Sequence, residues 1–310
     1  MTFHFSDLGA SLIAIATPFR GERIDEAAFA FLCERQIEHR TAGIVVCGST
    51  GEAASLSITE HEHAVRIAVQ AVCGRMPVIA GCTGVATAAA IELAKAGARA
   101  GADGLLCAAP PYIKPTQDGI FAHIRAVAHA TGLPIMLYDV PGRAGIRIAD
   151  ETIARLFAQE LIGALKDAAG DLARPSRLRA LCGPDLRQFS GDDATAAAHR
   201  AMGGHGCVSV TANLVPALCA SFHEAWDKGD LARFARIRDL LAPLHEALFI
   251  ESNPIPVKLA LEMLELCSSS VRLPLTRAGK ATREPLARLL PPLLLAEERA
   301  AAIPRYALAS

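Results

Sequence analysis

The chain lacks the features that mark binding to nucleic acid or insertion into membranes. Its 310 residues carry 31 Lys and Arg against 32 Asp and Glu, with no basic run, so nucleic acid and membranes are not expected partners. The longest apolar stretches are strand-length or are interrupted by Pro and Arg, so none predicts a membrane span. The first seven residues lack the basic and apolar regions of a signal peptide, so we expect a cytoplasmic protein.

Cysteine and histidine patterns typical of disulfide frameworks or metal sites are also missing. The nine cysteines are odd in number, include no Cys-x-x-Cys, and lie partly inside apolar runs. We therefore expect reduced thiols in the core and no metal. His61 and His63 are two residues apart, so on a helix they diverge, and we interpret them as surface histidines.

Short apolar runs alternate with longer Ala-rich segments over the first two thirds of the chain. The runs are typical of strands buried on both faces, and the longer segments have helical periodicity. The predicted strands are 12–16, 43–47, 77–81, 104–108, 134–138, 162–166, 186–190 and 206–210. The clearest predicted helices are 26–40, 58–74, 87–100 and 118–131, with N-caps at Asp25, Thr59, Thr87 and Thr116.

Eight strand-helix units of this length predict an α/β fold, a closed (β/α)8 TIM barrel. From about Pro216 the pattern is helical only, which predicts an appended C-terminal helical region. We place the catalytic barrel at residues 1–222 and the helical region at 223–310.

Lys166 ends the sixth predicted strand, at the barrel face where active sites lie. It is one of only six lysines, and it alone ends a strand-like apolar run. Desolvation of an amine is costly, but it lowers the pKa of the amine and frees its lone pair to attack a carbonyl. The alternative is a strand-end lysine that extends to water.

Other strand ends add polar groups to the same rim. The turn Gly48-Ser49-Thr50-Gly51-Glu52 offers N–H donors to a small carboxylate or phosphate, unless it is a simple Gly-rich turn. Tyr138 can transfer protons, and the guanidinium group of Arg143 can donate two parallel hydrogen bonds to a carboxylate. The alternative is a core tyrosine and a surface arginine. An amine, a phenol, an anion-binding turn and an arginine together favour carbonyl chemistry through a Schiff base.

These residues resemble the dihydrodipicolinate synthase / N-acetylneuraminate lyase family of class I aldolase-type barrels. The similarity covers roughly residues 10 to 280. Its segments are Ala16-Thr17-Pro18-Phe19, Gly48-Ser49-Thr50-Gly51-Glu52, Tyr138-Asp139-Val140-Pro141-Gly142-Arg143 and Gly163-Ala164-Leu165-Lys166-Asp167. Segments 190–193, 209–213, 253–258 and 272–275 resemble the branch that condenses pyruvate with L-aspartate 4-semialdehyde in lysine and diaminopimelate biosynthesis.

The resemblance implies a role for each site residue. Lys166 forms a covalent imine with pyruvate, so no cofactor is expected, and Thr50 with Ser49 holds the pyruvate carboxylate. Tyr138 transfers protons, relayed through Ser49 to Tyr112 of a neighbouring subunit. The expected assembly is therefore a homodimer or homotetramer.

The resemblance also implies how the substrates are bound. Arg143 binds the carboxylate of the aldehyde substrate. We add Gly48, Gly191 and Val208 to the predicted substrate-binding set.

Some positions differ from the family pattern. Ser49 replaces threonine, Pro111 replaces tyrosine, and Asp139 stands where asparagine is common, adding a charge beside Tyr138. Two alternatives therefore remain: a pyruvate-dependent aldolase or dehydratase acting on another sugar-acid or hydroxy-oxo-acid, and a barrel that has lost catalysis and serves in binding or regulation. Arg143 favours a short aldehyde with a carboxylate.

The site at which lysine inhibits some relatives lacks polar groups in this chain. Inhibited relatives have polar side chains where this chain has Ala53, Ile58, Val85, Ala89 and Pro111. We therefore expect millimolar L-lysine to leave the enzyme active.

Overall fold

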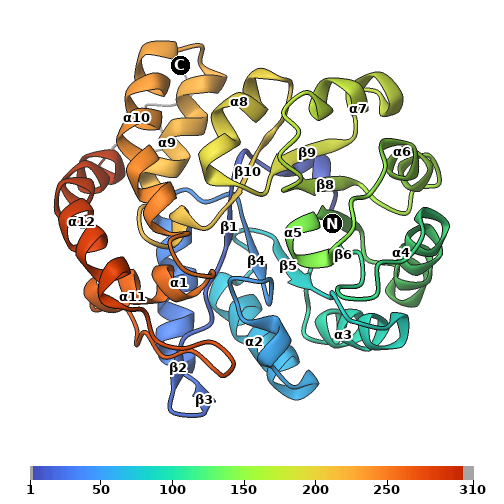
Figure 1. Ribbon diagram of the computed structural model, residues 1–310, viewed down its shortest axis with the longest axis horizontal. Coiled ribbons are helices and arrows are strands. Elements are labelled where there is room, and N and C mark those ends of the chain that lie inside the picture. The colour runs from blue at the N-terminus through green and yellow to red at the C-terminus, as the bar shows by residue number, and fades with distance from the viewer. Residues whose placement is uncertain (1–2, 303–310) are drawn as a thin grey trace.

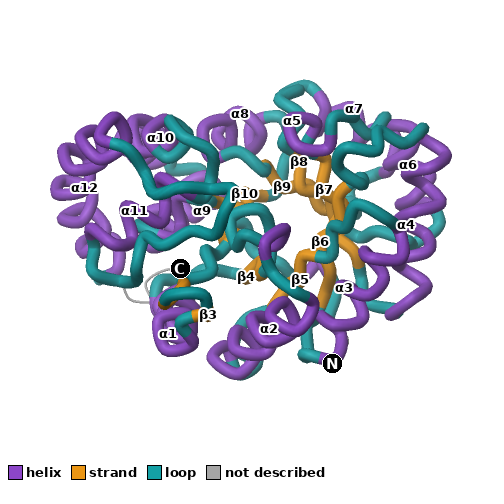
Figure 2. Tube along the Cα trace, turned by 60° about the horizontal axis from the view of Figure 1, so that its bottom comes forward, coloured by secondary structure: helices purple, strands orange, loops and turns teal. Residues whose placement is uncertain are grey.

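The computed structural model describes residues 3–302. Eight parallel strands form a closed barrel in the order β1-β10-β9-β8-β7-β6-β5-β4, and β4 pairs back to β1 (Figure 2). The strands are β1 (Ser11–Ala14), β4 (Gly43–Val46), β5 (Val78–Gly81), β6 (Gly104–Ala108), β7 (Ile135–Asp139), β8 (Ala164–Asp167), β9 (Arg187–Ser190) and β10 (Gly206–Ser209). Each overlaps a predicted strand, so the predicted barrel is confirmed. The short hairpin β2 (Phe19–Arg20) and β3 (Arg23–Ile24) was not predicted, because two residues show no periodicity.

Helices surround the barrel (Figure 1). They are α1 (Glu26–Glu38), α2 (Ile58–Val72), α3 (Thr87–Arg99), α4 (Gln117–Thr131), α5 (Pro141–Ala144), α6 (Asp150–Ala158), α7 (Arg174–Cys182), α8 (Ala196–Ala201), α9 (Pro216–Asp227), α10 (Leu231–Ala247), α11 (Ile255–Met263) and α12 (Lys280–Ala301). Four 3-10 turns are η1 (Phe5–Asp7), η2 (Ala53–Ser55), η3 (Asp193–Thr195) and η4 (Thr211–Asn213). Within residues 3–302, no helix has the length and apolarity needed to cross a bilayer.

The helices α10, α11 and α12 form the appended region that the sequence predicts, at the left of Figure 1. α12 packs on α9, α10 and α11, and α10 also packs on α9. The predicted domain boundary at residue 222 falls inside α9, which is continuous, so no break in the chain separates the two regions there. Residues 1–2 and 303–310, which the predicted domains included, lie outside the described residues.

Two of the four predicted helix caps are confirmed. The Asp25 side chain accepts a hydrogen bond from the Ala28 N–H, and Thr116 accepts one from the Gly119 N–H. The prediction of Thr59 was wrong, because Ser57 caps α2 and Glu60 completes a capping box with it. Thr87 was also wrong, because it is already inside α3 and Ala86 precedes it without a side-chain bond.

The hydrophobic core has two layers, one inside the barrel and one between strands and helices. The inner layer contains Leu12, Val45, Ile79, Leu106, Met136, Phe189 and Val208. Phe5 and Leu8 belong to the same cluster. The barrel interior is therefore packed with side chains rather than open as a pore, as is usual for this fold.

Burial corrects two expectations about cysteine and histidine. All nine thiols are free and six are buried in the core, but Cys182 and Cys267 are only partly buried at its edge and Cys73 is exposed. His61 is fully buried rather than on the surface, and its Nε2 lies 2.6 Å from the Gly81 carbonyl oxygen. This hydrogen bond joins α2 to the end of β5.

Three histidines cluster close to the start of β10. Burial lowers the pKa of His199 and His205 to about 4 and the pKa of His223 to about 3, and Arg200 opposes the protonation of all three. Both ring nitrogens of His199 and the Nδ1 atom of His223 are buried without a hydrogen-bond partner among the described residues. The folded protein therefore holds these rings neutral at pH values where the unfolded chain binds protons.

We predict that the free energy of unfolding falls as the pH drops from about 6.5 to about 4. The unfolded histidines, with a pKa near 6.5, take up protons in this range, whereas the buried rings do not. Each fully buried ring should contribute about 2–3 kcal/mol to the loss. Chemical denaturation at pH 7 and pH 5 measures it, and His199→Leu should reduce the difference, whereas replacement of the exposed His4 by Gln should not. An unchanged difference in His199→Leu would contradict this account.

Candidate active site

A cavity of about 400 Å³ lies at the carboxyl ends of the barrel strands. The barrel contributes Ser49, Thr50, Tyr138, Lys166, Gly191 and Val210, among other residues. Arg143 lines it from α5, and His245, Glu246, Phe249 and Asn253 line it from the C-terminal helical region. Most of the predicted site residues, which are far apart in the sequence, thus share one cavity.

Lys166 and Tyr138 are neighbours on adjacent parallel strands. They are direct partners in the register of β7 and β8, so both side chains point into the barrel. Lys166 is 5% exposed, and its Nζ atom lies 4.4 Å from the centroid of the Tyr138 ring. The structure gives this Nζ no hydrogen-bond acceptor or carboxylate partner within residues 3–302. A side chain added at Gly191 would place its Cβ 3.2 Å from the Lys166 Cε atom, so this glycine leaves room for the amine.

A second buried lysine, Lys258, differs from Lys166 because it has a carboxylate partner. Lys258 in α11 is fully buried, and its Nζ atom donates to Glu52 Oε1 at 2.6 Å. It also lies over the Phe19 ring at 4.2 Å. Burial lowers the pKa of Lys258, and Glu52 opposes this change. Lys258 therefore has a structural partner, whereas the Lys166 amine is free to react.

The turn at residues 48–52 presents two unused backbone donors. The Gly51 N–H donates to the Gly48 carbonyl at 3.1 Å, but the Ser49 and Thr50 N–H groups donate to no described protein group. Gly81 allows the chain to approach closely here, because a Cβ at this position would lie 2.0 Å from the Cys47 carbonyl oxygen. The two free donors, beside the Ser49 and Thr50 hydroxyls, suit a small carboxylate.

Asn253 connects two parts of the site and was not predicted. Its side-chain Nδ2 donates to Thr50 Oγ1 at 2.9 Å, and its backbone carbonyl oxygen accepts a hydrogen bond from Arg143 Nη2 at 3.3 Å. Arg143 is an exposed residue at the rim of the cavity, so its guanidinium group can also reach a bound anion.

A smaller cavity of about 160 Å³ adjoins the first and shares Ser49, Tyr138 and Arg143 with it. Gly48 and Pro111 line this smaller cavity. Tyr112 lines neither cavity: it is 89% exposed and has a positive φ of 72°. In the described chain, no hydrogen bond joins Tyr138, Ser49 and Tyr112.

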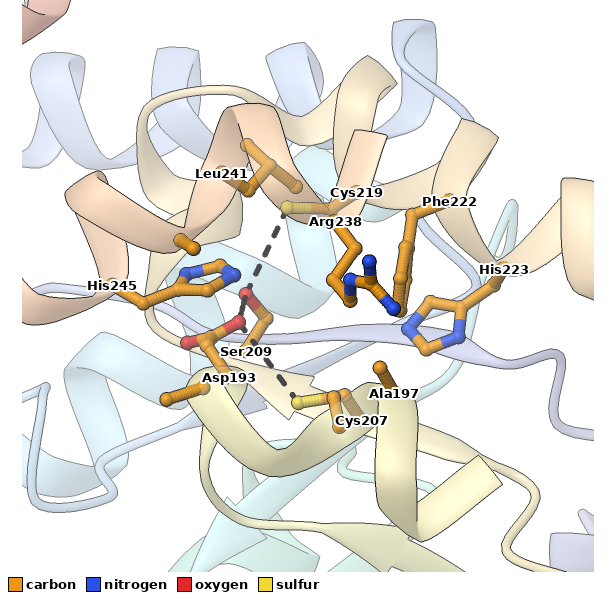
Figure 3. A pocket seen from close by; sticks show the side chains of 13 residues that line it. Asp193, Ala197, Cys207, Ser209, Cys219, Phe222, His223, Arg238, Leu241 and His245 are labelled. Carbon is orange, nitrogen blue, oxygen red and sulfur yellow. Dashed lines mark hydrogen bonds between the residues drawn. The ribbon is translucent and has the colours of Figure 1, made fainter. Parts of the chain in front are cut away.

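A third cavity, of about 40 Å³, lies between β10 and α10 and is drawn in Figure 3. The buried Asp193 carboxylate accepts hydrogen bonds from the Ser209 hydroxyl and from the N–H groups of Val210 and Thr211. These bonds hold the backbone of Val210, which lines the catalytic cavity. His245 lines this small cavity and also the 400 Å³ cavity that contains Lys166. Its Nδ1 atom lies 2.8 Å from Thr211 Oγ1.

The sequence model of the Dihydrodipicolinate synthetase family matches residues 7–292. The chain belongs to this family. A 4-hydroxy-tetrahydrodipicolinate synthase of Rhodospirillum centenum is 48% identical over 274 residues, which are 88% of this chain and 94% of the relative.

Two solved structures of the family also resemble this chain closely. The chloride-inhibited dihydrodipicolinate synthase of Acinetobacter baumannii, complexed with pyruvate, is 38% identical with a TM-score of 0.88. That alignment covers 96% of this chain and 100% of the other. A dihydrodipicolinate synthase of Cyanidioschyzon merolae with lysine bound is 37% identical with a TM-score of 0.90, covering 94% of this chain and 100% of the other.

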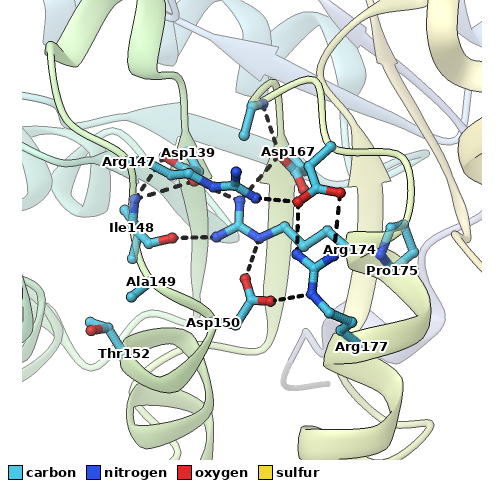
Figure 4. A network of polar contacts seen from close by, with 12 residues as sticks. Asp139, Arg147, Ile148, Ala149, Asp150, Thr152, Asp167, Arg174, Pro175 and Arg177 are labelled. Carbon is cyan, nitrogen blue, oxygen red and sulfur yellow. Dashed lines mark hydrogen bonds and ion pairs between the residues drawn. The ribbon is translucent and has the colours of Figure 1, made fainter.

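Two predictions from the family pattern change with the geometry. Asp139 does not add its charge to the cavity, because its side chain points away from the barrel axis and pairs with Arg174 at 2.6 Å (Figure 4). The charge of Asp139 therefore gives no reason to prefer a different aldehyde substrate. Val208 is fully buried in the inner core and does not line the cavity, whereas Val210 does. The predicted role of Val208 in substrate binding stays a prediction.

Proposed function

We infer that this chain catalyses the condensation of pyruvate with L-aspartate 4-semialdehyde to 4-hydroxy-tetrahydrodipicolinate, in lysine and diaminopimelate biosynthesis. The observation that carries the proposal is the buried Lys166 amine, which lies over the Tyr138 ring without an acceptor among the described residues. The name of the Rhodospirillum centenum relative, 4-hydroxy-tetrahydrodipicolinate synthase, supports the choice of reaction.

The proposed reaction passes through covalent intermediates on the Lys166 amine. The amine adds to the pyruvate ketone and loses water, which gives an imine. The imine withdraws electrons, so the methyl group loses a proton to form an enamine, and the enamine carbon bonds to the aldehyde carbon. The amino group of the semialdehyde then attacks the imine carbon, closes the ring and releases Lys166. Tyr138 is the proposed proton donor and acceptor for these steps.

The cavity has suitable groups for the carboxylates of both substrates. The free N–H groups of Ser49 and Thr50 are assigned to pyruvate, whose ketone then faces Lys166. Arg143 at the rim is assigned to the carboxylate of the semialdehyde. Charge-assisted bonds of this kind are worth about 1.5–3 kcal/mol each.

We predict that the purified protein turns over pyruvate with L-aspartate 4-semialdehyde in a steady-state assay. Arg143→Ala should raise the KM for the semialdehyde about 10- to 100-fold and leave the KM for pyruvate nearly unchanged, because only one substrate loses its partner. A protein that turns over a sugar-acid or hydroxy-oxo-acid aldehyde instead would support the aldolase or dehydratase alternative.

The same assay with millimolar L-lysine tests the expected loss of inhibition. Lysine is bound in the Cyanidioschyzon merolae relative. In this chain Ile58 and Val85 are about half exposed and Ala89 is exposed, and none of the three can bind an ammonium or a carboxylate with its side chain. Activity should therefore be unchanged, and strong inhibition would contradict the proposal.

We further propose that the smallest active unit is a homodimer, or a homotetramer built from such dimers. The support is the position of Tyr112, which is exposed beside the exposed Ile113, outside the cavities of its own chain. In a dimer, Tyr112 of one subunit would complete the relay through Ser49 to Tyr138 in the other.

We predict that two inactive variants, Tyr112→Phe and Tyr138→Phe, regain activity when their subunits are mixed. Each hybrid dimer contains one site with both tyrosines, so random mixing should restore about a quarter of the wild-type activity. The control mixes Lys166→Ala with Tyr138→Phe, which should restore none because both residues belong to the same subunit's site. A mixture of the tyrosine variants that stays inactive would contradict a relay between subunits.

A further inference from the structure

A fully buried arginine lies directly behind the two central site residues. Arg174, the first residue of α7, is 0% exposed (Figure 4). Its Nη1 atom lies 2.6 Å from Asp139 Oδ2 and 3.4 Å from Asp167 Oδ1, and its Nε atom lies 2.8 Å from Asp150 Oδ1. A cation at the start of a helix faces the positive end of the helix dipole, so the three carboxylates must offset both this cost and the cost of burial.

Strand alternation relates this network to the active site. Asp139 follows Tyr138 and Asp167 follows Lys166, and the register of β7 and β8 pairs Tyr138 with Lys166 and Asp139 with Asp167. Successive side chains point to opposite faces of a strand. The amine and the phenol ring therefore meet inside the barrel, while the two carboxylates meet outside it on the same guanidinium group.

The same guanidinium group also fixes the segment that follows Arg143. Its Nη2 atom donates to the Ile148 carbonyl, and the Ile148 N–H donates to the Asp139 carboxylate at 3.3 Å. Ile148 lies shortly after α5, the short helix that carries Arg143. One buried side chain therefore contacts the supports of Lys166, Tyr138 and Arg143.

We propose that Arg174 is a positioning residue for the reaction: by bridging Asp139 and Asp167 it sets the placement of the Lys166 amine against the Tyr138 ring. The proposal rests on the imine chemistry of the proposed function. Without Arg174, two buried carboxylates would face each other on adjacent strands. They would then share a proton or move apart, and either change would shift the strand ends that carry Lys166 and Tyr138.

The positioning role requires that residue 139 accept a hydrogen bond from Arg174. It does not require residue 139 to be charged. An asparagine oxygen can accept from Arg174 and from the Ile148 N–H in the same place, whereas a leucine can accept from neither. Asp139→Asn should therefore preserve the function of the network, and Asp139→Leu should not.

The test measures the rate and the end point of borohydride trapping of pyruvate on Lys166. Arg174→Met should form the imine about 10- to 100-fold more slowly than wild type, and Arg174→Lys about 10-fold more slowly, because a lysine cannot hold all three partners at once. The fraction of Lys166 that is finally labelled should stay complete in each variant. A merely structural role would instead lower the end point, because unfolded chains do not react.

Three further variants make the result decisive. Asp139→Leu should react slowly and Asp139→Asn at nearly the wild-type rate. Arg177→Met is the matched control, because Arg177 is 45% exposed and pairs with Asp150 and Asp171 without contacting Asp139 or Asp167. Wild-type rates in both Arg174→Lys and Asp139→Leu, or losses seen only in the end point, would overturn the proposal. A wild-type protein that pyruvate does not label at Lys166 would instead refute the proposed function.

Discussion

The site depends on the parallel pairing of β7 with β8. This pairing brings Lys166 opposite Tyr138 and places the amine 4.4 Å from the centroid of an aromatic ring, with the packed interior of the barrel beneath. A cation over a ring gains about 0.5–2 kcal/mol, which offsets only part of the cost of burying an ammonium. The barrel therefore supports a lysine that is poorly solvated and ready for covalent chemistry.

Three buried basic side chains at this end of the barrel differ in their partners. Lys258 is bound to Glu52, and Arg174 is bound to Asp139, Asp150 and Asp167. The contact described for the Lys166 amine within residues 3–302 is with the ring of Tyr138. The paired cations hold the parts of the site in place: Lys258 anchors the turn that carries Thr50, and Arg174 anchors the ends of β7 and β8. Lys166, which has no carboxylate partner among residues 3–302, is the side chain proposed to react.

Much of this arrangement could be predicted from the sequence, because it follows from local patterns. The strand-helix repeat predicted all eight barrel strands, and the rule that barrel sites lie at strand ends brought Lys166, Tyr138 and the turn at 48–52 to one rim. The strand ends also marked Thr50 and Arg143, and the family pattern gave each of them a role; the structure places both residues at the same cavity.

What could not be predicted depends on contacts between distant parts of the chain. Asn253 reaches Thr50 across 203 residues, and Lys258 reaches Glu52 across 206. The segment 253–258 was noted for its resemblance to the family, but nothing local to it predicts these partners. Asp139 was expected to add a negative charge to the site because it follows Tyr138 in the sequence. Strand alternation turns it to the outer face, where Arg174 binds it.

The most direct test of the central claim is borohydride reduction in the presence of pyruvate, followed by peptide mapping of both buried lysines. The account predicts a reduced pyruvate adduct on Lys166 and none on Lys258, because only the Lys166 amine has no carboxylate partner among the described residues. An adduct on Lys258, or no labelling that depends on pyruvate, would contradict it.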